Sequence, residues 1–181
     1  MAEKIPQGLI TEVVTPLRRY SQKSKVQRPT LRVGAPKYEL DVEGFRKLLT
    51  EVKKTAVLIN SRAEGTLLST EIRKKVIEEA MKVINGDTQL IIGITGNSAE
   101  ETLENIKMVE DCRKELRYTG KIFLFDCPLW YHSNRGLSAN YEKLTQFTSL
   151  PIILSNNPGL ISNRRKTLKR HSIRTNVFKK L

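Results

Sequence analysis

The sequence predicts an α/β fold in which short parallel strands alternate with amphipathic helices. Three observations support this class: the strand segments are apolar or β-branched, helix-capping residues follow them, and the pattern repeats. After a long first unit, the repeat is about 30 residues, which is the length of a strand–helix–strand unit. The predicted strands cover residues 8–15, 56–59, 89–93, 121–125 and 151–154.

The three longest predicted helices each begin after a residue that can accept a hydrogen bond from the first turn. Asp41 and Ser69 precede the first two, each followed by apolar residues at helical spacing. Ser98 and Glu101 have the spacing of a capping box before the third. Two shorter helices are predicted over 139–147 and 173–181.

The length suits one domain, or one and part of another, and the composition is that of a soluble globular protein. Of 181 residues, 39% are hydrophobic and 28% are charged, which allows a buried core. The longest apolar runs fall far below the roughly 18 residues that a membrane span requires. The amino-terminal residues lack the apolar core of a signal peptide, so we expect a cytoplasmic protein with no membrane partner. Cys112 and Cys127 have neither metal nor redox spacing, and we predict no cofactor and no metal site.

The net charge of +13 is concentrated in two basic segments. The loop predicted over 18–38 carries five basic residues between Arg18 and Arg28 and no acid. The segment 159–181, predicted to lead into a helix, carries eight between Arg164 and Lys180, again with no acid. Such clusters can contact phosphates, but a solvated surface is the favoured interpretation, and an oligomer contact or a nucleic-acid contact of the carboxyl-terminal segment is a weaker alternative.

Two architectures fit the strand–helix alternation: an open sheet with helices on both faces, and a (β/α)8 barrel. A nucleotide-binding open sheet has a glycine-rich turn after its first strand. Here that turn reads Thr15-Pro16-Leu17-Arg18 and contains no glycine. The pattern alone therefore favours the barrel, but only modestly.

Six segments in a fixed order carry a resemblance to a known family. They are Gly8–Leu17, Asp41–Leu49, Asn60–Glu64, Gly93–Ser98, Asp126–Trp130 and Leu150–Pro158. Each is weak alone, but their joint order and spacing resemble the dihydrodipicolinate synthase/N-acetylneuraminate lyase family of class I pyruvate aldolases. The resemblance spans nearly the whole chain and implies a partial (β/α)8 (TIM) barrel made of the first five strand–helix units.

The resemblance also implies a chemistry. In this family a lysine on the sixth strand forms a Schiff base with pyruvate, and the protonated imine accepts electrons so that the methyl carbon becomes a nucleophile. A Gly-Thr-Thr-Gly-Glu turn holds the pyruvate carboxylate, and a tyrosine at the end of the fifth strand shuttles protons. The implied partners are a small 2-oxo acid such as pyruvate and further copies of the chain in a homo-oligomer.

The turn that holds the carboxylate in the family departs from the family pattern here. Ser61 stands at the first threonine and keeps a hydroxyl, so we expect a catalytic position there. Arg62 stands at the second threonine and can grip an anion with its guanidinium group, or pair with Glu64 or Glu71 on the surface. Glu64 matches the family glutamate, and both Arg62 and Glu64 are expected to bind substrate.

The residues that follow the fourth and fifth predicted strands depart further from the family pattern. Trp130 stands at one of two paired family tyrosines, and Tyr131 replaces that pair if the loop shifts by one residue; both are expected to line the substrate site. Ser155 stands at the proton-shuttling tyrosine, where its higher pKa and shorter reach make it a poor replacement. The fold resemblance is therefore stronger than the catalytic one.

The sixth strand with its lysine is not part of this sequence. Lys179 and Lys180 fall on a predicted helix, and a surface lysine is not a desolvated imine former. We therefore expect this chain to be inactive as it stands. Two interpretations remain open: part of a longer lyase or aldolase, or a diverged relative that serves as an anion-binding or assembly module. Since five strands cannot close a barrel, we expect their edges to be buried by self-association or by further sequence.

Overall fold

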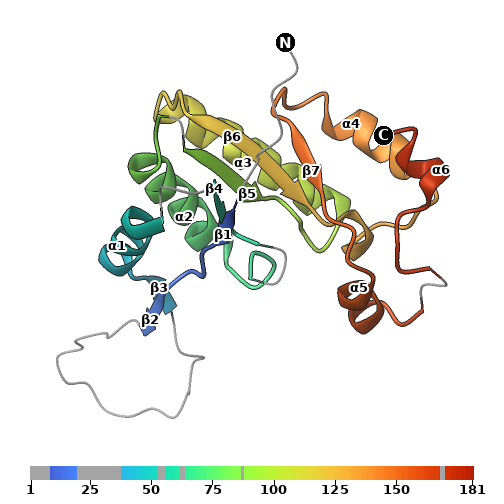
Figure 1. Ribbon diagram of the computed structural model, residues 1–181, viewed down its shortest axis with the longest axis horizontal. Helices are drawn as coiled ribbons and strands as arrows, with labels where there is room; N and C mark the ends of the chain where they lie inside the picture. The colour runs from blue at the N-terminus through green and yellow to red at the C-terminus, as the bar shows by residue number, and fades with distance from the viewer. Residues whose placement is uncertain (1–8, 20–37, 53–55, 62–63, 87, 168–169) are drawn as a thin grey trace, which may run out of the picture.

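The computed structural model describes residues 9–19, 38–52, 56–61, 64–86, 88–167 and 170–181. Its main sheet contains five parallel strands in the order β1-β4-β5-β6-β7. These are β1 (Ile10–Glu12), β4 (Ala56–Ile59), β5 (Gln89–Gly93), β6 (Lys121–Asp126) and β7 (Ile152–Leu154). Each of these strands pairs with the one that follows it along the chain, in the order in which the sequence predicts them. This arrangement confirms the α/β fold with parallel strands (Figure 1).

Four helices cover one face of this sheet. They are α1 (Val42–Val52), α2 (Thr70–Val83), α3 (Ala99–Glu115) and α4 (Leu137–Leu144). Their apolar residues, such as Phe45 and Ile106, share one core with the strand residues Ile59, Ile92 and Leu124, and all five side chains are fully buried. Figure 1 shows α3 lying behind β5 and β6, as this shared core requires.

The opposite face of the sheet carries a separate, smaller apolar cluster. Leu58, Ile91 and Phe123 form it, together with half-buried Phe125 and Ile153. These residues alternate along the strands with those that face the helices, as the two-residue period of a strand dictates. All members of the cluster that the structure describes come from strands, so the described helices pack on the other face of the sheet. This arrangement is that of a barrel wall rather than of a doubly wound sheet.

The helix caps predicted from sequence are confirmed. Ser69 Oγ accepts a hydrogen bond from Ile72 N at 3.3 Å, and Ser98 Oγ accepts one from Glu101 N at 3.2 Å. The Glu101 carboxylate bonds the backbone N–H of Asn97 at 2.8 Å, which is one residue before the capping serine. Each cap satisfies a donor that the first helical turn leaves without an intrahelical partner.

The basic loop predicted from residue 18 begins later in the structure. Leu17–Arg19 forms β2, which pairs antiparallel with β3 (Tyr38–Leu40), and Arg18 Nε lies 2.7 Å from Glu39 Oε1. The sequence pattern misses this pairing because the partners are about twenty residues apart and mostly polar. Residues 20–37 of the predicted loop lie outside the described part of the chain. In Figure 1 this small sheet projects away from the main one.

The carboxyl-terminal third differs most from prediction. Helix α4 covers Leu137–Leu144 rather than the predicted 139–147. It starts two residues earlier than predicted, directly after Gly136, the N-cap residue, which has a left-handed φ of 74°. A helix that was not predicted, α5 (Pro158–Arg164), follows β7, and its cap is Asn157 Oδ1 bonded to Leu160 N at 3.0 Å. The helix predicted over 173–181 is limited to α6 (Thr175–Phe178).

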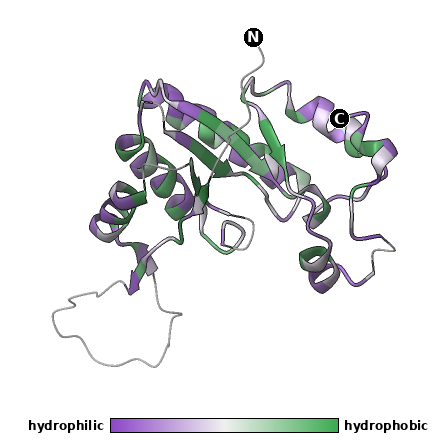
Figure 2. Ribbon diagram, viewed as in Figure 1, coloured by the Kyte–Doolittle hydropathy of each residue, from purple (hydrophilic) through white to green (hydrophobic). Residues whose placement is uncertain are grey.

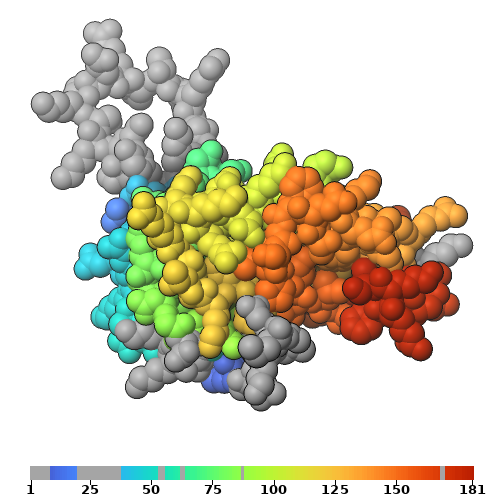
Figure 3. Space-filling model, turned by 90° about the horizontal axis from the view of Figure 1, so that it is seen from above, coloured from blue at the N-terminus to red at the C-terminus, as the bar shows by residue number. Residues whose placement is uncertain are grey.

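The distribution of apolar residues and the place of the carboxyl-terminal segment agree with helices packed on one face of the sheet. Figure 2 shows apolar residues running along β5, β6 and β7, while the helices alternate between apolar and polar residues. In Figure 3 the carboxyl-terminal segment forms one end of the molecule, beside α4. None of the helices that the structure describes combines the length and apolarity needed to cross a membrane.

Candidate functional site

Polar residues gather where the parallel strands end. Because the carboxyl ends of parallel strands meet at one edge, residues that follow different strands are brought to the same side of the sheet. The residues concerned are Thr15 after β1, Asn60 and Ser61 after β4, Thr95 after β5, Asp126 at the end of β6 and Ser155 after β7. All but Ser155 are at most 6% exposed, and Ser155 is half-buried.

The turn after β4 starts with an unusual backbone conformation. Asn60 has φ of 49°, in the left-handed region that asparagine tolerates better than most residues. Gly93 at the end of β5 packs directly against the Asn60 carbonyl, and a Cβ at residue 93 would overlap that oxygen. The glycine therefore lets the ends of β4 and β5 approach closely, and Asn60 is held 1% exposed between them.

Hydrogen bonds tie this turn to β1. The residue Ser61 is 3% exposed. Its backbone carbonyl accepts hydrogen bonds from Glu64 N at 3.1 Å and from Gly65 N at 2.6 Å. The Glu64 carboxylate in turn accepts from the backbone N–H of Thr15 at 2.6 Å. Glu64 is thus placed to support the turn, with one carboxylate oxygen already used by Thr15.

A buried arginine lies behind the turn. Arg73, on α2, is 2% exposed, and its Nη2 donates to the carbonyl of Gly65. The Nη2 of Arg73 lies 3.8 Å from Oε1 of Glu101, its ion-pair partner. The Nη1 of Arg73 has no hydrogen-bond partner among the described residues. Burial lowers the pKa of Arg73 and the Glu101 charge raises it, but a guanidinium group stays protonated in proteins. The turn therefore has a positive charge close behind it.

The end of β6 holds a buried carboxylate network. Asp126 is fully buried and accepts three hydroxyl hydrogen bonds: from Thr95 at 2.8 Å, Tyr131 at 2.8 Å and Tyr141 at 2.5 Å. The Thr95 hydroxyl also accepts from Cys127 N at 2.8 Å. We call these four side chains (Thr95, Asp126, Tyr131 and Tyr141) the Asp126 network.

Burial controls the proton equilibria of the network. Desolvation raises the pKa of Asp126, and the hydrogen bonds from the two tyrosines and Thr95 oppose part of that rise. Desolvation together with the nearby Asp126 charge raises the pKa of Tyr131 and of Tyr141. Both tyrosines therefore remain neutral donors near pH 7, and Tyr131 is anchored rather than poised to release a proton.

The ends of β1 and β4 are different, because polar atoms there have no partners. The hydroxyl of Thr15 and both side-chain atoms of Asn60, Oδ1 and Nδ2, are buried and make no hydrogen bond to any described residue. A buried polar group without a partner costs about 1–3 kcal/mol. Such groups are uncommon in folded proteins, and a ligand or an ordered water can complete their bonding.

A basic hollow opens beside the network. It has a volume of about 590 Å³. Its lining residues are Asn97, Trp130, Tyr131, Asn163, Arg164, Arg165, Lys166 and Thr167. The hollow brings together Trp130 and Tyr131, which the sequence predicted as substrate-site residues, with basic residues that it did not assign to a site.

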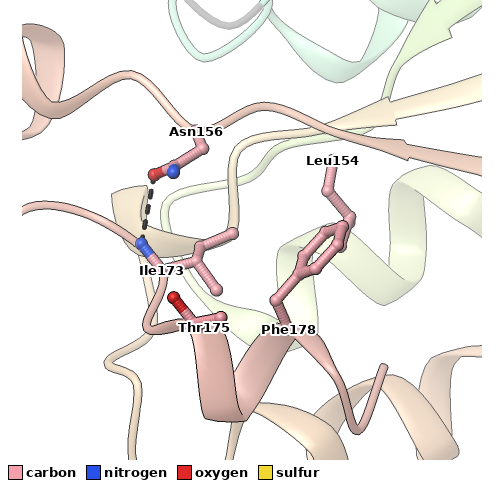
Figure 4. A pocket seen from close by; sticks show the side chains of 5 residues that line it. All are labelled: Leu154, Asn156, Ile173, Thr175 and Phe178. Atoms are coloured by element: carbon pink, nitrogen blue, oxygen red, sulfur yellow. Dashed lines mark hydrogen bonds between the residues drawn. The ribbon is translucent and has the colours of Figure 1, made fainter.

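A second hollow of about 270 Å³ lies between β7 and α6. It is lined by Leu154, Asn156, Ile173, Thr175 and Phe178, and Figure 4 shows Leu154 and Phe178 facing one another across it. The Asn156 side chain accepts a hydrogen bond from Ile173 N at 3.1 Å, which fixes the chain before α6. Ser155 lies between two lining residues but does not itself line this hollow.

The predicted site residues are brought together only in part. Ser61 and Ser155 lie at the ends of β4 and β7, and two strands separate these in the sheet. Trp130 and Tyr131 share the basic hollow. Arg62 lies outside the described residues, and so do its expected ion pairs. The catalytic and binding roles of all six residues stay predictions.

Several polar residues of this edge were not singled out from the sequence: Thr15, Asn60, Arg73, Thr95 and Asp126. One signal was available, since each of Asn60, Thr95 and Asp126 stands within two residues of the end of a buried strand. Arg73 carried no such signal, because an arginine on an amphipathic helix normally faces solvent. Among the described residues, no group of three or more histidine, cysteine or acidic side chains is arranged to hold a metal ion, and both cysteines are buried thiols that no disulfide joins.

Comparison with known sequences identifies relatives. The sequence model of the dihydrodipicolinate synthetase family matches residues 40–167. The 4-hydroxy-tetrahydrodipicolinate synthase of Methanocaldococcus jannaschii is 29% identical over 139 residues, which are 72% of this chain and 46% of the relative. That of Methanoculleus marisnigri is 26% identical over 158 residues, 84% of this chain and 47% of the relative. The chain thus spans less than half the length of these two curated relatives.

Solved structures show the same fold. Dihydrodipicolinate synthase from Aquifex aeolicus superimposes with a TM-score of 0.63 at 20% identity, covering 97% of this chain and 50% of that one. A prophage protein of the dihydrodipicolinic acid synthase family from E. coli K12, in complex with pyruvate, gives a TM-score of 0.56 at 23% identity. That match covers 68% of this chain and 41% of the other.

Proposed function

Because this chain belongs to the dihydrodipicolinate synthetase family, we propose that its turn after β4 binds the carboxylate of a small 2-oxo acid such as pyruvate. The observation that carries the proposal is the set of buried polar atoms without partners at this turn, on Thr15 and Asn60. A carboxylate needs hydrogen-bond donors, and the amide Nδ2 of Asn60 and the hydroxyl of Thr15 are available as donors.

Electrostatics support an anion at this turn. Arg73 is held behind it through Gly65, and the Glu101 carboxylate, with Oε1 3.8 Å from the Arg73 Nη2, offsets part of its charge. In a buried setting a fixed positive charge acts more strongly than in water. The predicted role of Ser61 is to place its hydroxyl beside the bound carboxylate, and that of Glu64 is to keep the turn closed against β1.

Carbon–carbon lyase or aldolase chemistry of the family type needs more than a carboxylate site. The pyruvate carbonyl must condense with a neutral lysine amine, lose water and form a protonated imine that accepts an electron pair. Lys179 and Lys180 are exposed at the end of α6, where water stabilises the charged amine. We therefore propose that an imine-forming lysine comes from sequence beyond these five strand–helix units.

A second candidate function is a diverged family member that binds anions without catalysing their reaction. The observation that favours it is Ser155, which stands where the resemblance implies a proton-shuttling tyrosine. Its backbone N–H donates to Asp126 O at 2.7 Å, so its position is fixed by the sheet edge. The serine side chain reaches less far than the tyrosine that the resemblance implies, and its hydroxyl is a poor acid at neutral pH.

Calorimetric titration of the chain tests the carboxylate site. Pyruvate is expected to bind saturably, whereas acetone, which keeps the keto group and lacks the carboxylate, is expected to give no binding heat. If neither pyruvate nor a larger 2-oxo acid gives heat, the proposed function is wrong.

Borohydride trapping separates the catalytic version from the binding version. With pyruvate and borohydride, the mass of the 181-residue chain is expected to stay unchanged, because its two carboxyl-terminal lysines are exposed. A protein that also contains the sixth-strand lysine is expected to gain one reduced pyruvate. A stable adduct on the 181-residue chain itself would contradict the proposed source of the lysine.

A further inference from the structure

The basic hollow next to Tyr131 has the size and charge of a small-molecule site. Its volume of about 590 Å³ falls within the range of roughly 300–1,000 Å³ that is usual for ligand pockets. Three consecutive basic residues, Arg164, Arg165 and Lys166, contribute to its lining, and none of the described lining residues is acidic. A concave surface lined by one sign of charge concentrates its electric field on whatever occupies it.

The hollow has a pre-positioned guanidinium group. Arg165 is half-buried, and its Nη1 donates to the carbonyls of His132 at 2.8 Å and Leu129 at 3.4 Å. These contacts link the segment after α5 to the loop after β6 and use only one of the three guanidinium nitrogens. An arginine held in this way loses less conformational entropy when it grips an anion.

The aromatic wall of the hollow has an unsatisfied donor. The guanidinium carbon of Arg164 lies 5.0 Å from the centre of the Trp130 ring, in cation–π range. The indole Nε1 of Trp130 is buried and donates to no described residue. A buried indole N–H normally finds an acceptor, so an acceptor group on a ligand would complete its bonding.

We propose that the basic hollow binds a small, multiply charged anion, either a phosphate ester or a dicarboxylate. Three positive side chains and one indole N–H would surround its oxygens, and the Trp130 ring would face its apolar part. An extended nucleic acid would need a continuous groove with a charge stripe along it, whereas the described lining gathers three basic residues in one hollow. The site shares no lining residue with the turn after β4, so it stands whether or not that turn binds pyruvate.

Trp130 allows a direct test, because it is the single tryptophan of the chain. Inorganic phosphate and succinate are titrated separately while Trp130 fluorescence is recorded, and the tighter ligand shows which anion class is preferred. Binding is expected to be saturable and to weaken as salt is added. The double variant R164Q/K166Q is expected to weaken it at least about tenfold, since two charged donors are lost.

The matched control neutralises two lysines outside the hollow. Lys179 and Lys180 are exposed at the end of α6, and K179Q/K180Q removes the same net charge. This control is expected to bind as the wild type does. Equal weakening by both double variants would overturn the proposal, because it would indicate a general charge effect.

Two further outcomes would also overturn it. One is the absence of any saturable change in Trp130 fluorescence with either anion. The other is tighter binding of a single-stranded oligonucleotide that depends on Lys179 and Lys180, which would indicate a nucleic-acid surface. If R164Q/K166Q unfolds, the salt dependence of the wild type decides, and affinity that does not respond to salt contradicts the proposal.

Discussion

Two buried polar regions lie at the same edge of the sheet and differ in how completely their groups are paired. In the Asp126 network, the carboxylate accepts three hydroxyls, and Thr95 both donates to it and accepts from Cys127. In the turn after β4, the side chain of Asn60 and the hydroxyl of nearby Thr15 make no hydrogen bond to a described residue. One region is complete within the chain, and the other is not.

The difference separates a structural role from a ligand-binding role. Paired buried groups stabilise the fold, because each lost partner leaves a desolvated donor or acceptor behind. Unpaired buried groups cost stability, and they persist where another requirement maintains them. Substitutions in the network are therefore expected to act on folding, and substitutions in the turn to act on ligand affinity.

The largest expected effect is that of D126A. It removes the acceptor for Thr95, Tyr131 and Tyr141 and leaves three buried hydroxyls to find other partners. We expect the free energy of unfolding to fall by about 3 kcal/mol or more. Urea denaturation followed by circular dichroism measures this, and a loss below about 1 kcal/mol would show that the network is not structural.

The next largest effect is expected from N60G, which changes the turn after β4. Glycine adopts a φ of 49° freely, and this gain offsets the greater entropy of the unfolded chain, so stability is expected to change by less than about 1 kcal/mol. Pyruvate affinity is expected to fall about tenfold or more, because a hydrogen bond to a charged group is lost. Calorimetry that finds unchanged affinity would remove Asn60 from the site.

A matched pair of threonine substitutions makes the comparison sharper. T95V is expected to lower the free energy of unfolding by about 1–3 kcal/mol, because it removes one of the three hydroxyls that donate to Asp126 and also the acceptor that Thr95 offers to Cys127 N. T15V makes the same chemical change where the hydroxyl has no described partner, so it is expected to leave stability unchanged or raise it by up to about 1 kcal/mol. Equal losses from the two variants would erase the distinction between the regions.

The smallest expected effect is a difference in pH dependence. Burial raises the pKa of Asp126 above its value in the unfolded chain, so the folded protein binds this proton more tightly. Its contribution to stability is complete below the unfolded pKa of about 3.9 and is lost as the pH rises through the folded pKa. The stability advantage of the wild type over D126N is therefore expected to shrink as the pH rises above about 4. An advantage that grows with pH would contradict the direction of the shift.

The fold was largely predictable because its signals are local. The strands at Gln89–Gly93 and Ala56–Ile59 are apolar throughout, and Ser69 and Ser98 mark helix starts, so each element is visible within a short window. Helix α5 carried the same kind of signal, a capping Asn157 followed by Pro158, and it was overlooked.

The site was less predictable because its contacts depend on strand register. Thr95 meets Asp126 across 31 residues of sequence, and whether a hydroxyl reaches that carboxylate follows from which residues lie side by side in β5 and β6. The left-handed conformation of Asn60 likewise occurs where the end of its strand lies against Gly93 of the neighbouring strand. Motif comparison placed Ser61 and Ser155 at strand ends but could not show which neighbouring groups are paired.

The side-chain amide of Asn60 offers the most direct test of the claim that the turn after β4 is an incomplete anion site. Its ¹H–¹⁵N signal, assigned by its loss in N60G, is followed by NMR during a pyruvate titration. We predict a saturable shift of that signal, with the hydroxyl and backbone signals of the Asp126 network unchanged. A signal that stays in place while pyruvate binds elsewhere, or that never responds, would contradict the account.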